Sequence, residues 1–312
     1  MTRLLEETRN HPQRGFEWSY WQRRIHQDVR TFHGHSGPLR GVALSPDGRF
    51  AATASAEDLA GPNGKLWDLS TGREHHSFDF PENCRAVAFS PDGQRLAVGG
   101  VGRMLVWDIA DRREVFSLTN RFNAPVWSLA FSPEGGRIAI GLFEEPAVLI
   151  ADAATGQVLN ELSDGNTNNV ASLAFSNDGS RVATAEAIGT AHLWELPSGR
   201  LLHRLDAGGG WPWQLGFDAT GKRLVTAHWD GAARVWNVAT GAVERTLEGH
   251  TQPLQCALFS PDGSRIYTAG WDEQVRIWDS ATGKELGRLP KGHSHGIISM
   301  ALSRDGRHVL TG

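Results

Sequence analysis

The sequence predicts an all-β protein: a β-propeller of seven four-stranded blades, the last of them incomplete because its third strand is missing. Three observations support this fold class. One turn recurs seven times, its glycines are 42 to 45 residues apart, and alternating apolar runs flank each copy. Because a four-stranded blade has this period, each copy of the turn is expected to mark one blade.

The recurring turn reads Ser-Pro-Asp-Gly or a close variant of it. The Asp side chain can form a hydrogen bond with the backbone close to it in the chain, and the Gly tolerates positive φ, so the segment suits a tight turn. With an apolar alternating run on either side, the turn predicts a β-hairpin in each unit. The seven turn glycines are Gly48, Gly93, Gly135, Gly179, Gly221, Gly263 and Gly306.

A third run, usually ending in tryptophan, follows most of these hairpins, as in Arg276-Ile277-Trp278-Asp279. A second turn, such as Thr282-Gly283, then leads to a short fourth run. Each unit therefore comprises four short strands. The third unit departs from this pattern because Ala151-Asp152 replaces the Trp-Asp pair, yet we still expect a blade there.

Composition argues against several classes of protein. With 31 basic and 35 acidic residues the net charge is -4, which gives no general attraction to nucleic acid. No apolar run approaches the ~20 residues that span a bilayer, so no membrane partner is expected. Cys84 and Cys256 indicate neither a disulfide framework nor a zinc site. The N-terminus lacks the apolar core of a signal peptide, and we expect a cytoplasmic protein.

Gly-His pairs precede several hairpins, at Gly34-His35, Gly249-His250 and Gly292-His293. Together with the Ser-Pro-Asp-Gly turns and the Trp-Asp pairs, in fixed order and spacing, they make the chain resemble the WD40-repeat family over roughly residues 28 to 312. The resemblance implies a WD40 β-propeller that acts as a protein-binding scaffold and is not an enzyme.

The resemblance further implies a buried structural tetrad of His, Thr, Asp and Trp in each regular blade. Such a cluster could suggest a hydrolase, but buried polar groups need partners, which favours a structural role. The second and third units carry apolar residues instead: Phe80 and Phe122 at the histidine position, Val98 and Ile140 at the hydroxyl position. In the fifth unit Gly208 stands at the histidine position. The tetrad residues assigned are His35, Thr53, Trp67, Thr226, Asp230, Trp236, His250, Thr268, Asp272 and Trp278.

The two ends of the chain raise a question of closure. Residues 1–27 are expected to form a partly helical connector, and residues 28–312 the propeller. Residues 4–7 and 14–24 resemble the connector that precedes WD-repeat arrays in large bacterial proteins, often behind a serine/threonine kinase domain. Residues 28–32 should supply the outermost strand of the last blade, but the chain stops before that blade's third strand. We favour a truncated piece over an open edge, and a monomer or part of a larger polypeptide.

A partner is expected at the mouth of the central channel. The family's pattern places one side chain there eight residues before each turn glycine, which gives Arg40, Arg85, Trp127, Ala171, Trp213, Gln255 and Ile298. Arg and Trp dominate binding energy at protein interfaces. Three further tryptophans are expected on the same face, although each could instead pack on a neighbouring blade and expose only an edge. The candidate partner-binding residues are Arg40, Arg85, Trp127, Trp211, Trp213, Trp229, Gln255 and Trp271.

These residues support the hypothesis that the face grips a protein or peptide that is acidic or phosphorylated. Two alternatives remain. A propeller hydrolase would hold a metal ion in its channel, but the expected mouth has no carboxylate and no histidine, so no metal or other cofactor is expected. A nucleic-acid binder could use Arg23, Arg24 and Arg30 with Trp18 and Trp21, yet a connector packed along the propeller rim explains those residues more simply.

Overall fold

The computed structural model describes residues 30–312, except for 57–61, 81–82, 120–123, 144–147, 165–168, 187–188, 207, 209 and 291. The chain divides into two compact units, Met1–Gly34 and His35–Gly312. The expected connector at 1–27 lies outside the described residues. Across the described residues, no helix has the length and apolar character that crossing a bilayer requires.

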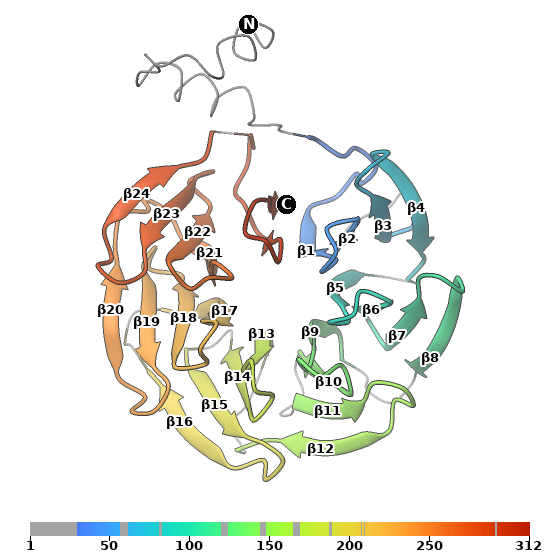
Figure 1. The fold of residues 1–312 in the computed structure, drawn as a ribbon, viewed down its shortest axis with the longest axis horizontal. Coiled ribbons are helices and arrows are strands. Elements are labelled where there is room, and N and C mark those ends of the chain that lie inside the picture. The colour runs from blue at the N-terminus through green and yellow to red at the C-terminus, as the bar shows by residue number, and fades with distance from the viewer. Residues whose placement is uncertain are drawn as a thin grey trace, which may run out of the picture. The chain divides into compact units, whose positions relative to one another are not determined.

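Six antiparallel four-stranded sheets form the blades of the second unit, and they are arranged around a common centre (Figure 1). We number them blade 1 (β1–β4) to blade 6 (β21–β24). Within each blade the strands follow one another in chain order from the centre to the rim. The innermost strands are β1 (Leu39–Leu44), β5 (Cys84–Phe89), β9 (Val126–Phe131), β13 (Val170–Phe175), β17 (Pro212–Phe217) and β21 (Leu254–Phe259).

The remaining strands complete these sheets toward the rim. The second strands are β2 (Phe50–Ser55), β6 (Arg95–Gly100), β10 (Arg137–Leu142), β14 (Arg181–Glu186), β18 (Arg223–His228) and β22 (Arg265–Gly270). The third strands are β3 (Gly64–Asp68), β7 (Arg103–Asp108), β11 (Val148–Asp152), β15 (Ala191–Glu195), β19 (Ala233–Asn237) and β23 (Val275–Asp279). The outermost strands are β4 (Arg73–Phe78), β8 (Arg113–Thr119), β12 (Val158–Leu162), β16 (Leu201–Leu205), β20 (Val243–Leu247) and β24 (Glu285–Arg288).

The prediction of seven blades is wrong: among the described residues the propeller has six. The seventh unit forms only a two-stranded sheet, β25 (Met300–Leu302) with β26 (Val309–Thr311). Residues 30–32, expected as part of the outermost strand of that blade, form no strand. The physical reason is that the outermost strand of a blade pairs with the third strand. The described part of the seventh unit has only two strands, so residues 30–32 have no third strand to pair with.

The seventh unit nevertheless fills the space between blade 6 and blade 1. Strand β25 packs against both β1 and β21. The Val42 backbone N–H in β1 donates a hydrogen bond of 3.0 Å to the Ser299 hydroxyl. The same kind of bond joins neighbouring innermost strands elsewhere, since the Leu173 N–H donates to Ser128 Oγ at 3.0 Å. The inner circle of strands is therefore continuous across the seventh unit.

The predicted hairpin turns are confirmed in all seven units, because every turn glycine has a φ between 66° and 76°. The first turn shows how the sequence dictates it. The Ser45 hydroxyl donates to Asp47 Oδ1 at 2.6 Å and accepts the Phe50 N–H at 2.8 Å, while the Gly48 N–H donates to the Ser45 carbonyl. Positive φ at the fourth position then returns the chain into the second strand.

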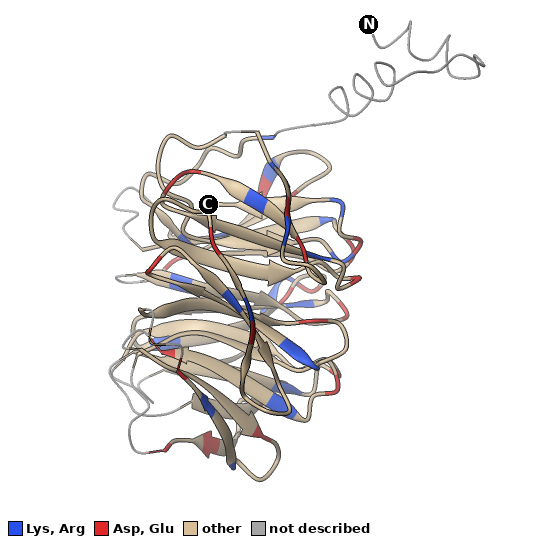
Figure 2. Ribbon diagram, turned by 90° about the vertical axis from the view of Figure 1, so that its left-hand side faces the viewer, with Lys and Arg blue, Asp and Glu red and all other residues tan. Residues whose placement is uncertain are grey.

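The hydrophobic core lies between blades rather than within one. A cluster of buried side chains joins blade 2 to blade 3 through Met104, Val106, Val126 and Ile138, and comparable clusters join the other neighbouring pairs from blade 1 to the seventh unit. Each sheet thus buries its two faces against its neighbours. Charged residues of both signs are spread over the blades (Figure 2).

Close contact between blades predicts that added volume there is harmful. A Cβ atom on Gly141 in β10 would lie 2.8 Å from Val170 Cγ1 and 3.1 Å from Leu173 Cδ2 of the next blade. We expect Gly141→Ala to lower the free energy of unfolding by about 1–3 kcal/mol, measured by urea unfolding. The matched control is Gly287→Ala in β24, where a Cβ meets nothing within 4 Å. Equal stability of the two variants would contradict this packing.

Candidate partner-binding site

A β-bulge occurs at the same place in the innermost strand of every complete blade. In β1 the pairing with β2 shifts between Leu39 and Gly41, so that Arg40 is the extra, unpaired residue. A bulge breaks the strand's alternation and redirects one side chain. The residues at this position in blades 1 to 6 are Arg40, Arg85, Trp127, Ala171, Trp213 and Gln255.

These six positions are those that the sequence predicted for the channel mouth, and all six line one central cavity of about 540 Å³. Ile298 of the seventh unit lines it as well, as do Trp229 and Trp271. Of the candidate partner-binding residues, Trp211 alone is absent from the lining. It lies beside the cavity, with its ring centroid 6.2 Å from that of Trp229.

The aromatic side chains at the mouth form a continuous arc. Phe143 stacks on Trp127 with ring centroids 4.0 Å apart and an interplanar angle of 17°. Trp127 in turn lies 6.5 Å from Trp213 at 22°, Trp213 lies 6.1 Å from Trp229, and Trp229 lies 5.6 Å from Trp271. We call Phe143, Trp127, Trp213, Trp229 and Trp271 the aromatic arc. It runs from blade 3 to blade 6.

The positive charge of the mouth lies at blades 1 and 2. The Arg85 guanidinium lies 4.9 Å from the centroid of Trp127, a cation–π distance that holds it against the arc. Arg40 is exposed, and no described residue forms an ion pair with it. Among the described residues that line the cavity there is no Asp, Glu or His. The described lining of the mouth therefore contains two arginines and several indoles and no carboxylate.

The predicted structural tetrad is assembled completely in blade 6. His250 Nδ1 lies 2.9 Å from both carboxylate oxygens of Asp272, and His250 Nε2 lies 2.8 Å from Thr268 Oγ1. The Trp278 indole N–H donates to the same hydroxyl at 2.7 Å. Burial lowers the pKa of His250, although the Asp272 carboxylate opposes this. The His250 and Asp272 side chains are buried, and each polar group of the cluster already has a partner, which fits a structural role.

The described residues of blade 1 form part of the same network. Thr53 Oγ1 lies 2.8 Å from His35 Nε2, and it accepts the Trp67 indole N–H at 2.8 Å. In the seventh unit His293 Nε2 lies 2.7 Å from Thr311 Oγ1. The hydroxyl therefore serves as the common partner of the histidine in three separate units.

Blade 5 departs from the predicted tetrad. The Trp236 N–H donates to Thr226 Oγ1 at 2.8 Å as expected, but Asp230 pairs with Arg234, 2.6 Å away, rather than with a histidine. The place of the missing imidazole is taken by His228, whose Nε2 lies 2.7 Å from Thr226 Oγ1. Its Nδ1 donates to the Gly210 carbonyl at 3.1 Å. Burial lowers the pKa of His228 to about 4.

Blades 2 and 3 replace the polar cluster with buried apolar side chains, as the sequence predicted for Phe80, Val98 and Ile140. Phe122, expected at the same position of blade 3, lies outside the described residues. Blade 4 holds a network that the sequence analysis missed. There the Trp194 N–H donates to Thr184 Oγ1 at 3.2 Å, and His192 pairs with the buried Glu186.

Phe143 is the mouth residue that sequence reasoning missed, although a signal was present. It stands three residues after Ile140, as Trp229 stands after Thr226 and Trp271 after Thr268. The backbone N–H at each of these three positions donates to a carbonyl two residues before the bulge of its own blade. Among the described residues, no group of three or more His, Cys, Asp or Glu is placed to hold a metal ion.

The repeats match the family model described as "WD domain, G-beta repeat". The match covers residues 26–59, 70–108, 156–195, 199–237 and 241–279, which is more than half of the chain. The chain therefore belongs to this WD40 family. The matched stretches leave out residues 109–155, where the third unit lacks the Trp-Asp pair.

Several curated proteins are similar to parts of the chain. Eukaryotic translation initiation factor 3 subunit I of Pyricularia oryzae is 29% identical over 175 residues, which cover 52% of this chain and 50% of that protein. WD repeat-containing protein SL1-17 of Schistosoma mansoni is 30% identical over 191 residues, covering 60% and 59%. Subunit I of the same factor in Scheffersomyces stipitis is 34% identical over 113 residues, covering 34% and 31%. The chain thus spans between 31% and 59% of the length of these relatives.

The tetrad of blade 6 predicts a specific loss of stability. Thr268→Val keeps the side-chain shape but leaves the Trp278 N–H and His250 Nε2 without their partner. Because each of the two buried orphans costs about 1–3 kcal/mol, we expect a loss of roughly 2–6 kcal/mol in the free energy of unfolding. Thr246→Val on the exposed side of β20 is the control and should change little. If the Thr268→Val protein were as stable as this control, the structural role of the blade 6 tetrad would be contradicted.

The depressed pKa of His228 predicts how stability depends on pH. Folded His228 takes up a proton only near pH 4, whereas the unfolded side chain does so near 6.5. The unfolded state therefore binds more protons in this window, and stability falls as the pH falls from 6.5 to 4, by at most about 3 kcal/mol from this residue. Urea unfolding of wild type and His228→Gln across that window should show a smaller slope for the variant. Identical slopes would contradict the prediction.

Proposed function

We propose that this chain is a non-catalytic scaffold that holds a partner protein or peptide at the mouth of its central channel. One observation carries the proposal: six bulge residues from six blades line a single cavity, with Arg40 and Arg85 on one side and Trp127 and Trp213 on the other. Arg and Trp are the side chains that most often dominate protein interfaces. The absence of acidic side chains from the described lining favours an acidic or phosphorylated segment.

The relatives support a role within a larger assembly. Two of those reported above are named as subunits of a translation initiation factor, which makes those proteins parts of a larger factor. We propose that this chain too acts in a larger complex or polypeptide, and that it does so in the cytoplasm. The link to a bacterial kinase stays a prediction, and the three relatives are eukaryotic and none is named as a kinase.

A peptide array tests the site. Wild-type protein should be retained on acidic and phosphorylated peptides more than on neutral or basic ones of equal length. The double variant Arg40→Ala, Trp213→Ala removes one cation and one indole from the mouth, and its retention should fall at least about tenfold, as for truncation of interface hot spots. If the double variant were retained on these peptides as strongly as wild type, the mouth would not be the binding site.

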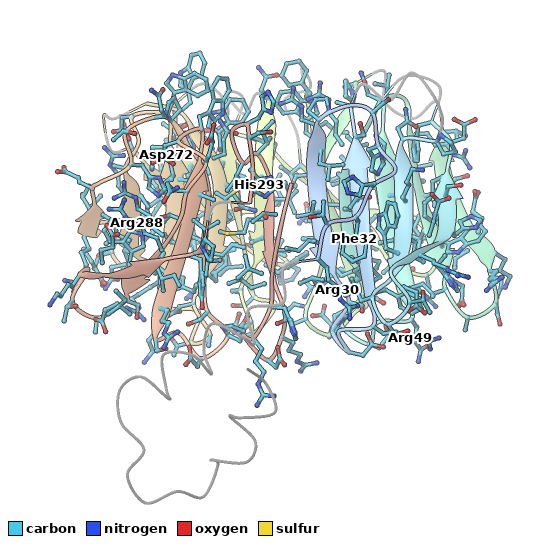
Figure 3. The ribbon with its side chains drawn as sticks, turned by 90° about the horizontal axis from the view of Figure 1, so that it is seen from above. Arg30, Phe32, Arg49, Asp272, Arg288 and His293 are labelled. Atoms are coloured by element: carbon cyan, nitrogen blue, oxygen red, sulfur yellow. The ribbon has the colours of Figure 1, made fainter. Side chains whose placement is uncertain are left out.

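The control for that array is Arg49→Ala. Figure 3 places Arg49 at the lower face and Asp272 near the upper face of the ring. Asp272 directly follows Trp271, which lines the cavity. The Arg49 side chain is 62% exposed and lies 3.9 Å from Asp68, a pair worth little in water. Its loss removes the same charge as Arg40→Ala and should leave peptide retention intact.

A further inference from the structure

Three tryptophans beside the mouth expose an unusual amount of apolar surface. The exposed fractions are 46% for Trp211, 39% for Trp229 and 48% for Trp271. The ring centroid of Trp229 lies 6.2 Å from that of Trp211 and 5.6 Å from that of Trp271, so the three indoles form one row. We call these three residues the indole platform. Isolated exposed apolar side chains need no explanation, but three contiguous indoles form a patch of the kind that marks an interaction site.

The backbone holds this platform in place before any ligand arrives. The Trp229 N–H donates to the Trp211 carbonyl at 3.0 Å, and the Trp271 N–H donates to the Pro253 carbonyl at 3.0 Å. His228 adds a third tie, because its Nδ1 binds the carbonyl of Gly210, next to Trp211. A surface that is ordered in the free protein loses little entropy on binding, which favours stacking on it.

The small side chain of Ala171 leaves room for two indoles of the aromatic arc to approach each other. Blade 4 lies between the blades that carry Trp127 and Trp213, and its bulge residue is the small Ala171. The two indoles of the flanking blades can therefore approach to 6.5 Å across it. A large side chain at 171 would separate them and divide the aromatic arc into two parts.

One hydrogen-bond donor in the aromatic arc, the Trp213 indole N–H, has no acceptor among the described residues. This N–H is buried. A buried donor without a partner costs free energy. Because the Trp213 N–H is closed to solvent, a ligand carbonyl oxygen recovers this cost only if the indole ring turns toward the mouth on binding. A polyproline II segment has no internal hydrogen bonds and leaves its backbone carbonyls free, while its proline rings present flat apolar faces.

We propose that the mouth binds a proline-rich segment in the polyproline II conformation, next to acidic residues. The prolines lie on the indole platform and the arc, a backbone carbonyl accepts the Trp213 N–H, and the acidic group meets Arg40 and Arg85. Aromatic grooves suit such segments because the ligand is already extended and ordered. This inference rests on the proposed function and names the chemistry of its ligand.

The probe is a fluorescein-labelled peptide of sequence Glu-Glu-Pro-Pro-Pro-Pro-Gly, and fluorescence anisotropy measures its Kd. Two comparison peptides replace either the prolines by glycine or the glutamates by phosphoserine. We expect the glycine peptide to bind wild type at least tenfold more weakly, and the phosphoserine peptide to bind at least as well as the parent. The double variant Trp229→Ala, Trp271→Ala should weaken the proline peptide roughly thirtyfold, the scale of a hot-spot loss.

Further variants separate the binding role from a folding defect. Ala171→Phe should weaken the proline peptide at least tenfold by dividing the arc, without removing any indole. Leu286→Ala is the matched control, because Leu286 is 54% exposed on the rim strand β24 and its loss should leave the Kd unchanged. The platform residues are exposed, so thermal melting of the double variant should stay close to that of wild type.

Several outcomes would overturn the inference. They are equal binding of the glycine and proline peptides, no binding of the proline peptide, or full affinity in the Trp229→Ala, Trp271→Ala variant. A single-stranded oligonucleotide that displaces the peptide at equal concentration would assign the arc to base stacking instead. In any of these cases, retention on the acidic peptides of the array could still depend on Arg40 and Trp213. The proposed function would then stand, and this inference alone would fail.

Discussion

Packing between blades is the constraint on which the rest of this structure depends. A four-stranded sheet with two apolar faces can bury both only against copies of itself, and the hydrophobic clusters indeed join neighbouring blades. This arrangement brings the innermost strands around one axis. Residues more than two hundred positions apart in the chain, such as Arg40 and Gln255, therefore line the same cavity.

The repeated bulge turns that architecture into a surface with variable chemistry. An extra residue at one place in each innermost strand redirects a side chain without disturbing the pairing that follows it. The scaffold is thus kept the same while the six bulge residues differ. Two arginines, two tryptophans, an alanine and a glutamine give the mouth a cationic side and an aromatic side. The small residue, Ala171, matters as much as the large ones because it lets the aromatic residues meet.

Local chemistry made much of this predictable from the sequence. The turn glycines fix the hairpins. The pattern of the WD40 family, counted back from those glycines, located all six bulge positions, although the bulge itself leaves no local signal. The number of blades was not predictable in the same way, because closure depends on which strands find partners far along the chain. His228 replaced the missing histidine of blade 5 because the Thr226 hydroxyl can be approached from more than one position. Phe143 was missed because no tetrad aspartate follows it, whereas Asp230 follows Trp229 and Asp272 follows Trp271.

The central claim is that the bulge residues and the aromatic arc form one partner-binding surface. The most direct measurement is a crystal structure of this chain in complex with the peptide that it retains most strongly. The account predicts that the peptide crosses the mouth, with contacts to Arg85, Trp213 and Trp229. A peptide seated on the rim strands, or on the face that carries Arg49, would contradict it.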